Sequence, residues 1–166
     1  MAKPASANFT RGAISAVVLI LIWLAAFSAA NLFNFFKTYS SIWFLPTGVI
    51  ISVVLVAPGW LKLTPLLANL LLVLEPVQRI LGVTIVHDYE PILHGLRLNA
   101  VYGGAALVML HVMRMNVPFR RLSDVEKLLG TSLVAALLAT ISGIGLHMLT
   151  GDMVWTDALA IGADWW

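Results

Sequence analysis

Long apolar runs without charged side chains constrain the fold of this 166-residue chain more than any other feature. The first run extends from Ala13 to Phe36 and ends at Lys37. A bilayer core about 30 Å thick needs about 20 such residues in a helix, because lipid offers no partners for backbone polar groups. Hydrophobic residues make up 60% of the chain and charged residues 11%, which excludes a water-soluble enzyme and a disordered protein. The sequence therefore predicts an all-α integral membrane protein.

Four further segments extend this prediction to a polytopic bundle of about five transmembrane helices. They are Ile42 to Ala57, Leu63 to about Gly82, Gly95 to Met115, and Lys127 to Leu149. The third span is ambiguous, because only twelve apolar-dominated positions precede Glu75 and Pro76. It either crosses the membrane as a helix to Gly82, which we favour, or forms a re-entrant half-helix.

Local signals mark where two of these helices begin. Pro46 fits the first turn of the second span, where its missing N–H costs nothing. Ser123 and Glu126 have the spacing of a capping box ahead of the fifth span. The segment from Met153 to Trp166 is too short to cross and is predicted to lie at the interface. We find no soluble domain and predict a single transmembrane domain over residues 1–166.

The distribution of Lys and Arg predicts the orientation. With the amino terminus in the cytoplasm, seven cations fall inside and three outside, as the positive-inside rule favours. The inner seven are Lys3, Arg11, Lys62, Arg114, Arg120, Arg121 and Lys127, and the outer three are Lys37, Arg79 and Arg97. The last four of the inner set form a basic patch suited to anionic lipid. A net charge of only +2 gives no footprint for nucleic acid. We therefore expect a bacterial inner-membrane protein with lipids as its first partners.

Three segments carry a resemblance to a known family. The sequence IWFLPTG at 42–48, which contains Trp43, Pro46 and Gly48, is followed by LLANL at 66–70 with Asn69. The other two are NVPFRRLSDV at 116–125, which contains Arg121 and Asp124, and the terminal DWW at 164–166. Together they resemble the MASE1 domain, an integral membrane sensory module of bacterial signalling proteins.

The resemblance implies a module that relays a stimulus to a cytoplasmic histidine kinase or c-di-GMP enzyme. Family members usually have more spans than this chain and precede such an output domain. The resemblance therefore implies a partial module here, with the output domain outside these 166 residues. It implies no particular ligand.

Ionisable side chains near the third and fourth spans are candidates for ligand sensing. Glu75 and Arg79 are four residues apart, a spacing that permits an ion pair on a helix. Arg97 and Asn99 open the fourth span on the same predicted side. Such groups are costly in lipid and normally face protein or water. The four side chains either form a polar cluster that contacts an unknown small ligand or anchor the helices at the interface.

The histidines are the only candidates for a metal or haem site. His87, Glu90 and His94 are spaced by three and four residues, which would align them on one helical face, although Pro91 interrupts that pattern. His147 would join them if the outer end of the fifth span meets the outer start of the fourth. The alternatives are interfacial hydrogen bonding and outward-facing pH sensitivity. No cysteine is present, and no cofactor is predicted.

Other polar and small residues indicate helix packing. Asn69 is expected to hold the bundle together through an interhelical hydrogen bond. Ala135, Ala139 and Gly143 recur every fourth residue, a pattern that lets helix backbones approach, within one chain or in a homodimer. Trp23 lies in mid-span and is expected to pack either in the bundle or against lipid.

Sensing is the first of three functional hypotheses. The second is a small transporter or transporter subunit, which would account for spans interrupted by proline and for intramembrane polar residues. The third is a haem- or metal-binding redox subunit built on the histidines. The sequence contains no Gly-rich phosphate loop and no Ser-His-Asp set at suggestive spacing, so we predict no enzymatic activity for this chain.

Overall fold

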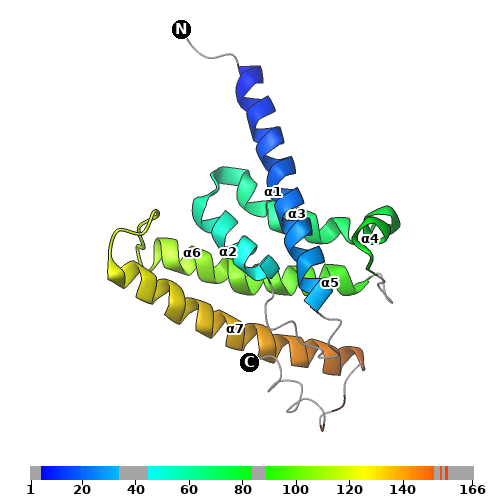
Figure 1. Ribbon diagram of the computed structural model, residues 1–166. Helices are drawn as coiled ribbons and strands as arrows, with labels where there is room; N and C mark the ends of the chain where they lie inside the picture. Colours follow the sequence, from blue (N-terminus) through cyan, green and yellow to red (C-terminus); the bar gives the residue numbers. More distant parts are fainter. Residues whose placement is uncertain (1–4, 34–44, 84–88, 152–153, 155, 157–166) are drawn as a thin grey trace.

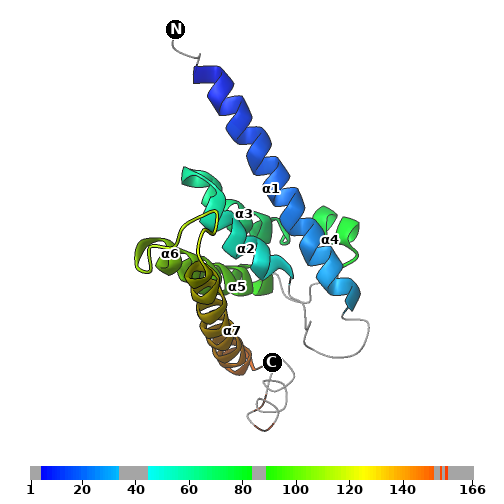
Figure 2. The same ribbon diagram turned by 60° about the vertical axis from the view of Figure 1, so that its left-hand side comes forward.

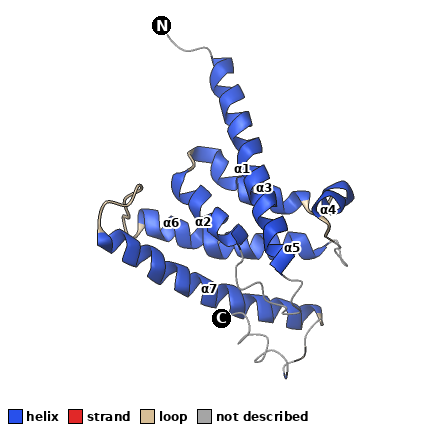
Figure 3. Ribbon diagram, viewed as in Figure 1, coloured by secondary structure: helices blue, strands red, loops and turns tan. Residues whose placement is uncertain are grey.

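Helices are the only regular elements among the residues that the computed structural model describes, which are 5–33, 45–83, 89–151, 154 and 156 (Figures 1 and 3). Side chains are described for the same residues except 5–9, 31–33 and 89–91. The predicted interfacial segment from Met153 to Trp166 lies almost entirely outside these ranges, as does Trp43. The all-α prediction is confirmed for the described part.

The elements follow one another as helices of very different length. They are α1 (Ala5–Phe33), α2 (Leu45–Val56), a 3-10 helix η2 (Gly59–Leu63), α3 (Thr64–Leu71), α4 (Glu75–Leu81), α5 (Tyr89–Leu98), a π-helical segment η3 (Asn99–Gly103), α6 (Gly104–His111) and α7 (Leu122–Thr150). Three helices are long and apolar enough to cross a membrane: Thr10–Ala30 in α1, Ile92–His111 across α5, η3 and α6, and α7. If the bent pair described in the next paragraph is one span, the number of candidate spans becomes four. The apolar helix α2 is shorter than a span, so length and composition do not give the predicted five among the described residues.

The third predicted span, from Leu63 to about Gly82, is not one continuous helix, and the favoured crossing of the membrane stays a prediction. The helical stretches Gly59–Leu71 and Glu75–Leu81 meet at 90°. Pro76 explains the break, because it has no N–H to donate to the carbonyl of Leu72 in a continuous α-helix and restricts the residue before it. The side-chain amide of Gln78 donates to that Leu72 carbonyl at 2.8 Å instead. The segment is therefore a broken span or a re-entrant loop.

Trp23 lies where α1 packs against α2 and α3. Its side chain is fully buried, stacks on Phe27 with ring centroids 5.4 Å apart, and belongs to a cluster with Ile50, Ala68 and Leu72. This contact joins α1 to α2 and α3. Of the two environments expected for Trp23, the structure thus selects the bundle interior.

The helices α5, α6 and α7 lie on the other side of α2 and α3. A second core of Ile51, Val54, Ala106, Met109 and Met115 joins α2 to α6. The three small residues predicted to allow close packing on the fifth span, Ala135, Ala139 and Gly143, are all buried in α7, which contacts α5, η3 and α6. Figure 2 shows α1 and α7 on opposite sides of the intervening helices. The predicted close approach is therefore confirmed within one chain.

The outer faces of α1 and α7 are apolar. Exposed residues include Ile14, Val17, Leu21, Leu129, Leu133 and Ile141, each between 56% and 65% accessible. Water-soluble monomers rarely expose large contiguous apolar patches. The outer helices are therefore compatible with contact to lipid.

Candidate functional site

A polar junction lies between α5 and α7, formed by His94, Arg97, Ser142, His147 and the carbonyl of Ala139. The Arg97 guanidinium donates through Nη1 to the Ala139 carbonyl and to Ser142 Oγ, the latter at 3.3 Å. Its Nη2 is 3.5 Å from His94 Nδ1, and the His94 and His147 rings lie 4.8 Å apart between centroids. Four side chains from two helices thus converge on one contact.

The small residues of α7 account for the reach of Arg97. Ala139 and Gly143 present almost no side chain, so the α5 backbone approaches closely enough for Arg97 to bond a main-chain carbonyl. The Ser142 hydroxyl donates to the same Ala139 carbonyl at 3.1 Å. Arg97 is half-buried, and its Nε is buried without a hydrogen-bond partner among the described residues. An arginine in an apolar bundle is expected to face protein in this way.

A π-helical segment directly follows the junction. Asn99 begins η3, and its side-chain amide donates to the Gly95 carbonyl at 2.8 Å. π segments inside α-helices are frequent at functional sites. Asn99 does not contact the polar junction but lines a pocket on another side of the helix.

Glu75 and Arg79 pair with each other on α4, as their spacing predicts. Their side chains are 75% and 77% exposed. Within the described residues, no hydrogen bond or ion pair joins them to Arg97 or Asn99. The four ligand-sensing candidates therefore do not form a single cluster, because the 90° bend ahead of α4 separates the first two from the others.

His94 and His147 are brought together, as the metal or haem hypothesis required. The helix α5 begins at Tyr89, so Pro91 lies in its first turn and does not interrupt it. His87 and the Glu90 side chain lie outside the described residues. Among the side chains that are described, no group of three or more His, Cys, Asp or Glu is placed to hold a metal. The redox hypothesis stays a prediction.

Asn69 makes a hydrogen bond within its own helix α3 and not the interhelical one expected of it. It is 4% exposed, and its amide donates to the Pro65 carbonyl one turn earlier at 3.0 Å. Gly95 packs against it so closely that an added Cβ would lie 2.7 Å from the Asn69 Cβ. The pair Asn69 and Gly95 therefore sets the distance between α3 and α5. Pro46 lies buried in the first described turn of α2, and Gly48 is exposed.

Asp124 organises the loop before α7. It is 1% exposed, and its carboxylate accepts backbone N–H groups of Asn116 at 3.4 Å and of Arg120 and Arg121 at 3.3 Å. The predicted capping box of Ser123 and Glu126 is wrong, because α7 begins at Leu122, one residue before that serine. Asp124 caps the helix in its place.

Two residues at these contacts were missed by sequence reasoning. Gln78 gives no signal beyond its position two residues after Pro76, and Ser142 none beyond lying one residue from Gly143.

Comparison of the chain with protein-family models, with curated proteins and with solved structures finds no match.

Proposed function

We propose that this chain is a membrane-embedded sensory module that relays a ligand or membrane stimulus to a cytoplasmic output domain outside these residues. The observation that carries the proposal is the contact of Arg97 with the small-residue face of α7. The resemblance of its sequence segments to MASE1 and its membrane-length apolar helices support the same assignment.

Relay through a bundle requires two packings with different affinities for the stimulus. The α5–α7 contact suits this role, because hydrogen bonds from one arginine and packing of small residues hold it together. Packed helices can slide past one another by small amounts in such transitions. We infer that the stimulus changes the position of α7 relative to α5.

The arrangement of connections supports the proposed orientation. The turn between α2 and α3, with Lys62, and the loop between α6 and α7, with Arg120 and Arg121, lie toward the left of Figure 1. The helix α4 and the carboxyl end of α7 lie toward the right. The left side carries more cations and is proposed to face the cytoplasm of a bacterium. The amino end of α1 lies at the top of Figure 1, and its proposed cytoplasmic position rests on the charges of the sequence.

The absence of native cysteine makes a direct test practical. Spin labels at Leu93→Cys on α5 and Leu133→Cys on α7 are placed on side chains 38% and 59% exposed. In lipid nanodiscs we expect two distance populations, with Arg97→Ala changing their ratio and Arg79→Ala, on the exposed α4, leaving it unchanged. A single distance that is insensitive to Arg97→Ala would refute the switch.

A second measurement addresses signalling itself. In a full-length protein where this chain precedes a kinase or cyclase domain, Arg97→Ala is expected to abolish the response at an unchanged amount of membrane protein. Arg79→Ala serves as the matched control. A normal response from the Arg97 variant would remove the junction from the relay.

The 90° break between α3 and α4 favours a transporter as the second candidate. Discontinuous helices line substrate and ion sites in many secondary transporters. Solute uptake by proteoliposomes that contain only this chain would establish transport and displace the sensory proposal.

A further inference from the structure

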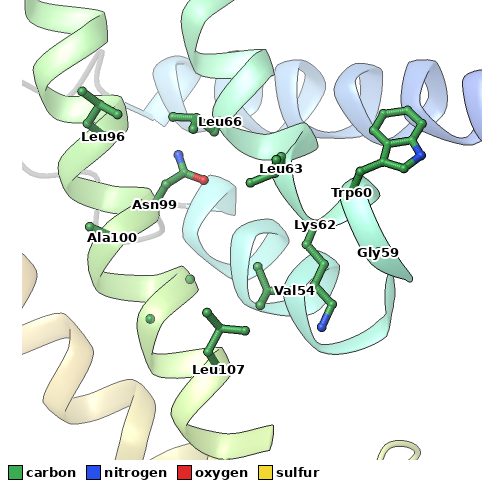
Figure 4. Close-up of a pocket in the computed structure, with 12 residues that line it drawn as sticks. Val54, Gly59, Trp60, Lys62, Leu63, Leu66, Leu96, Asn99, Ala100 and Leu107 are labelled. Carbon is green, nitrogen blue, oxygen red and sulfur yellow. The ribbon is translucent and has the colours of Figure 1, made fainter. Parts of the chain in front are cut away.

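A pocket of about 640 Å³ lies between the η2–α3 segment and the continuous helix α5–η3–α6 (Figure 4). Small residues on both walls create the space: Gly59 on η2, Ala100 and Gly103 on η3, and Gly104 on α6. Leucine and valine side chains and Trp60 line the rest. The size is within the range of about 300–1,000 Å³ that ligand pockets occupy.

The polar groups of the pocket are few and distinct. Among the described residues, Lys62 is the only charged one that lines the pocket, and no carboxylate lies within ion-pair distance of its ammonium. Asn99 lines the opposite wall, and in Figure 4 its amide points toward Leu63. Because the amide nitrogen of Asn99 donates to Gly95, its oxygen remains as an acceptor. The pocket therefore offers a cation beside a long apolar surface.

The shape of the pocket is elongated. Leu96 and Leu107 mark its extent along the α5–η3–α6 helix, and eleven residues of helical rise separate them by about 16 Å. In Figure 4 the Lys62 ammonium lies toward the Leu107 end. An occupant with a charged end and a long apolar body fits this arrangement better than a compact polar solute.

We propose that this pocket binds an acyl chain of an anionic membrane phospholipid, whose acidic headgroup pairs with Lys62. The connection between α2 and α3, which contains Lys62, and the loop between α6 and α7, which contains Arg120 and Arg121, lie toward the same side of Figure 1. Anionic headgroups would concentrate on this side. This inference does not depend on sensing, since a lipid site serves a transporter equally.

A second groove provides a comparison within the same protein. It has a volume of about 880 Å³ between α1 and α2 and is lined by residues such as Ile14, Val18 and Val53, with Ser15 and Ser52. Its described lining residues include no charged side chain. That groove accepts any acyl chain that the bilayer supplies. Of these two grooves, only the pocket that contains Lys62 is therefore expected to select the headgroup.

The test is titration of the delipidated chain with phosphatidylglycerol, with phosphatidylcholine of the same acyl chains and with oleate, followed by native mass spectrometry. We expect the first tightly bound phosphatidylglycerol to exceed phosphatidylcholine in affinity by about fivefold, the effect of one surface cation. Lys62→Gln should abolish that difference, and Arg120→Gln, which removes a loop cation outside the pocket, should preserve it.

Filling the pocket is the second arm. A Cβ at Gly104 would meet no atom within 4 Å, so Gly104→Leu is expected to fold and to weaken binding of both phospholipids at this site. Gly130→Leu on α7, where the added Cβ also meets nothing within 4 Å, is the matched control. Equal affinity for both headgroups in the unmodified chain, or headgroup selectivity that survives Lys62→Gln, would overturn the proposal. Binding of oleate in place of phosphatidylglycerol would overturn the choice of a phospholipid.

Discussion

Replacing Gly95 by alanine is expected to separate α5 from α3 and to destabilise the bundle. The new Cβ would lie 2.7 Å from the Asn69 Cβ, 2.9 Å from its Cγ and 3.1 Å from its Oδ1. The closest atom is a Cβ, which cannot move without its backbone, so rotation of the Asn69 side chain cannot relieve the contact. The two helices must shift.

The magnitude follows from a comparison with a second glycine. Glycine-to-alanine replacement inside a helix normally stabilises by about 1 kcal/mol, and this term is common to Gly95→Ala and Gly130→Ala. A Cβ added at Gly130 would meet, among the described residues, no atom within 4 Å beyond its own helix backbone and chain neighbours. Overpacking at Gly95 costs about 1–3 kcal/mol of stability. Because Gly130→Ala has no such cost, this is the expected difference in the free energy of unfolding between the two variants. For a chain of this size that difference corresponds to about 2–12 °C in melting temperature.

Thermal unfolding in one detergent, followed by circular dichroism, provides the assay. We expect Gly95→Ala to melt below Gly130→Ala, and the deficit to shrink when Asn69→Gly removes all three contacting atoms. The reasoning is refuted if Gly95→Ala melts at or above Gly130→Ala in the original background.

Three further predictions concern the other helix contacts. Asp124→Ala should lower the melting temperature more than Glu126→Ala, because only the Asp124 carboxylate accepts three backbone N–H groups. Equal melting temperatures of the two variants would favour the capping box of Ser123 and Glu126 instead. Trp23→Ala should cost about 3–5 kcal/mol of stability and Trp23→Phe far less, since the buried indole N–H has no partner among the described residues; denaturant titration measures both. Ala139→Leu should cost about 1–3 kcal/mol by overpacking the face toward α5, whereas Leu138→Ala, at a side chain 52% exposed, should change stability by no more than about 0.5 kcal/mol; thermal unfolding of the pair compares them.

The long apolar helices could be predicted from the sequence because their signal is local. The run from Ala13 to Phe36 overlaps α1, and the small residues at every fourth position of α7 identified its packing face. The identity of the partner was not predictable, since Ala139 bonds Arg97 through a backbone carbonyl, a group that every residue possesses.

The break after α3 shows why composition was insufficient there. Pro76 signalled an interruption, but a kinked crossing and a sharp bend have the same proline. The difference depends on whether another donor reaches the Leu72 carbonyl, which Gln78 does from six residues away. The separation of Glu75 and Arg79 from Arg97 follows from that bend and could not be read from spacing.

The π segment from Asn99 to Gly103 determines which neighbouring helices the side chains of α5 and α6 face. Each residue of an α-helix advances by about 100° around the axis, and a π turn accommodates one extra residue. The side chains of α6 are therefore rotated about the helix axis, compared with their directions in a continuous α-helix. With this rotation, Arg97 in α5 donates a hydrogen bond to α7. Met109, further along the same helix, packs with Ile51 in the core. Deleting one residue from the segment would restore regular winding, and the two halves could then no longer satisfy both neighbours at once.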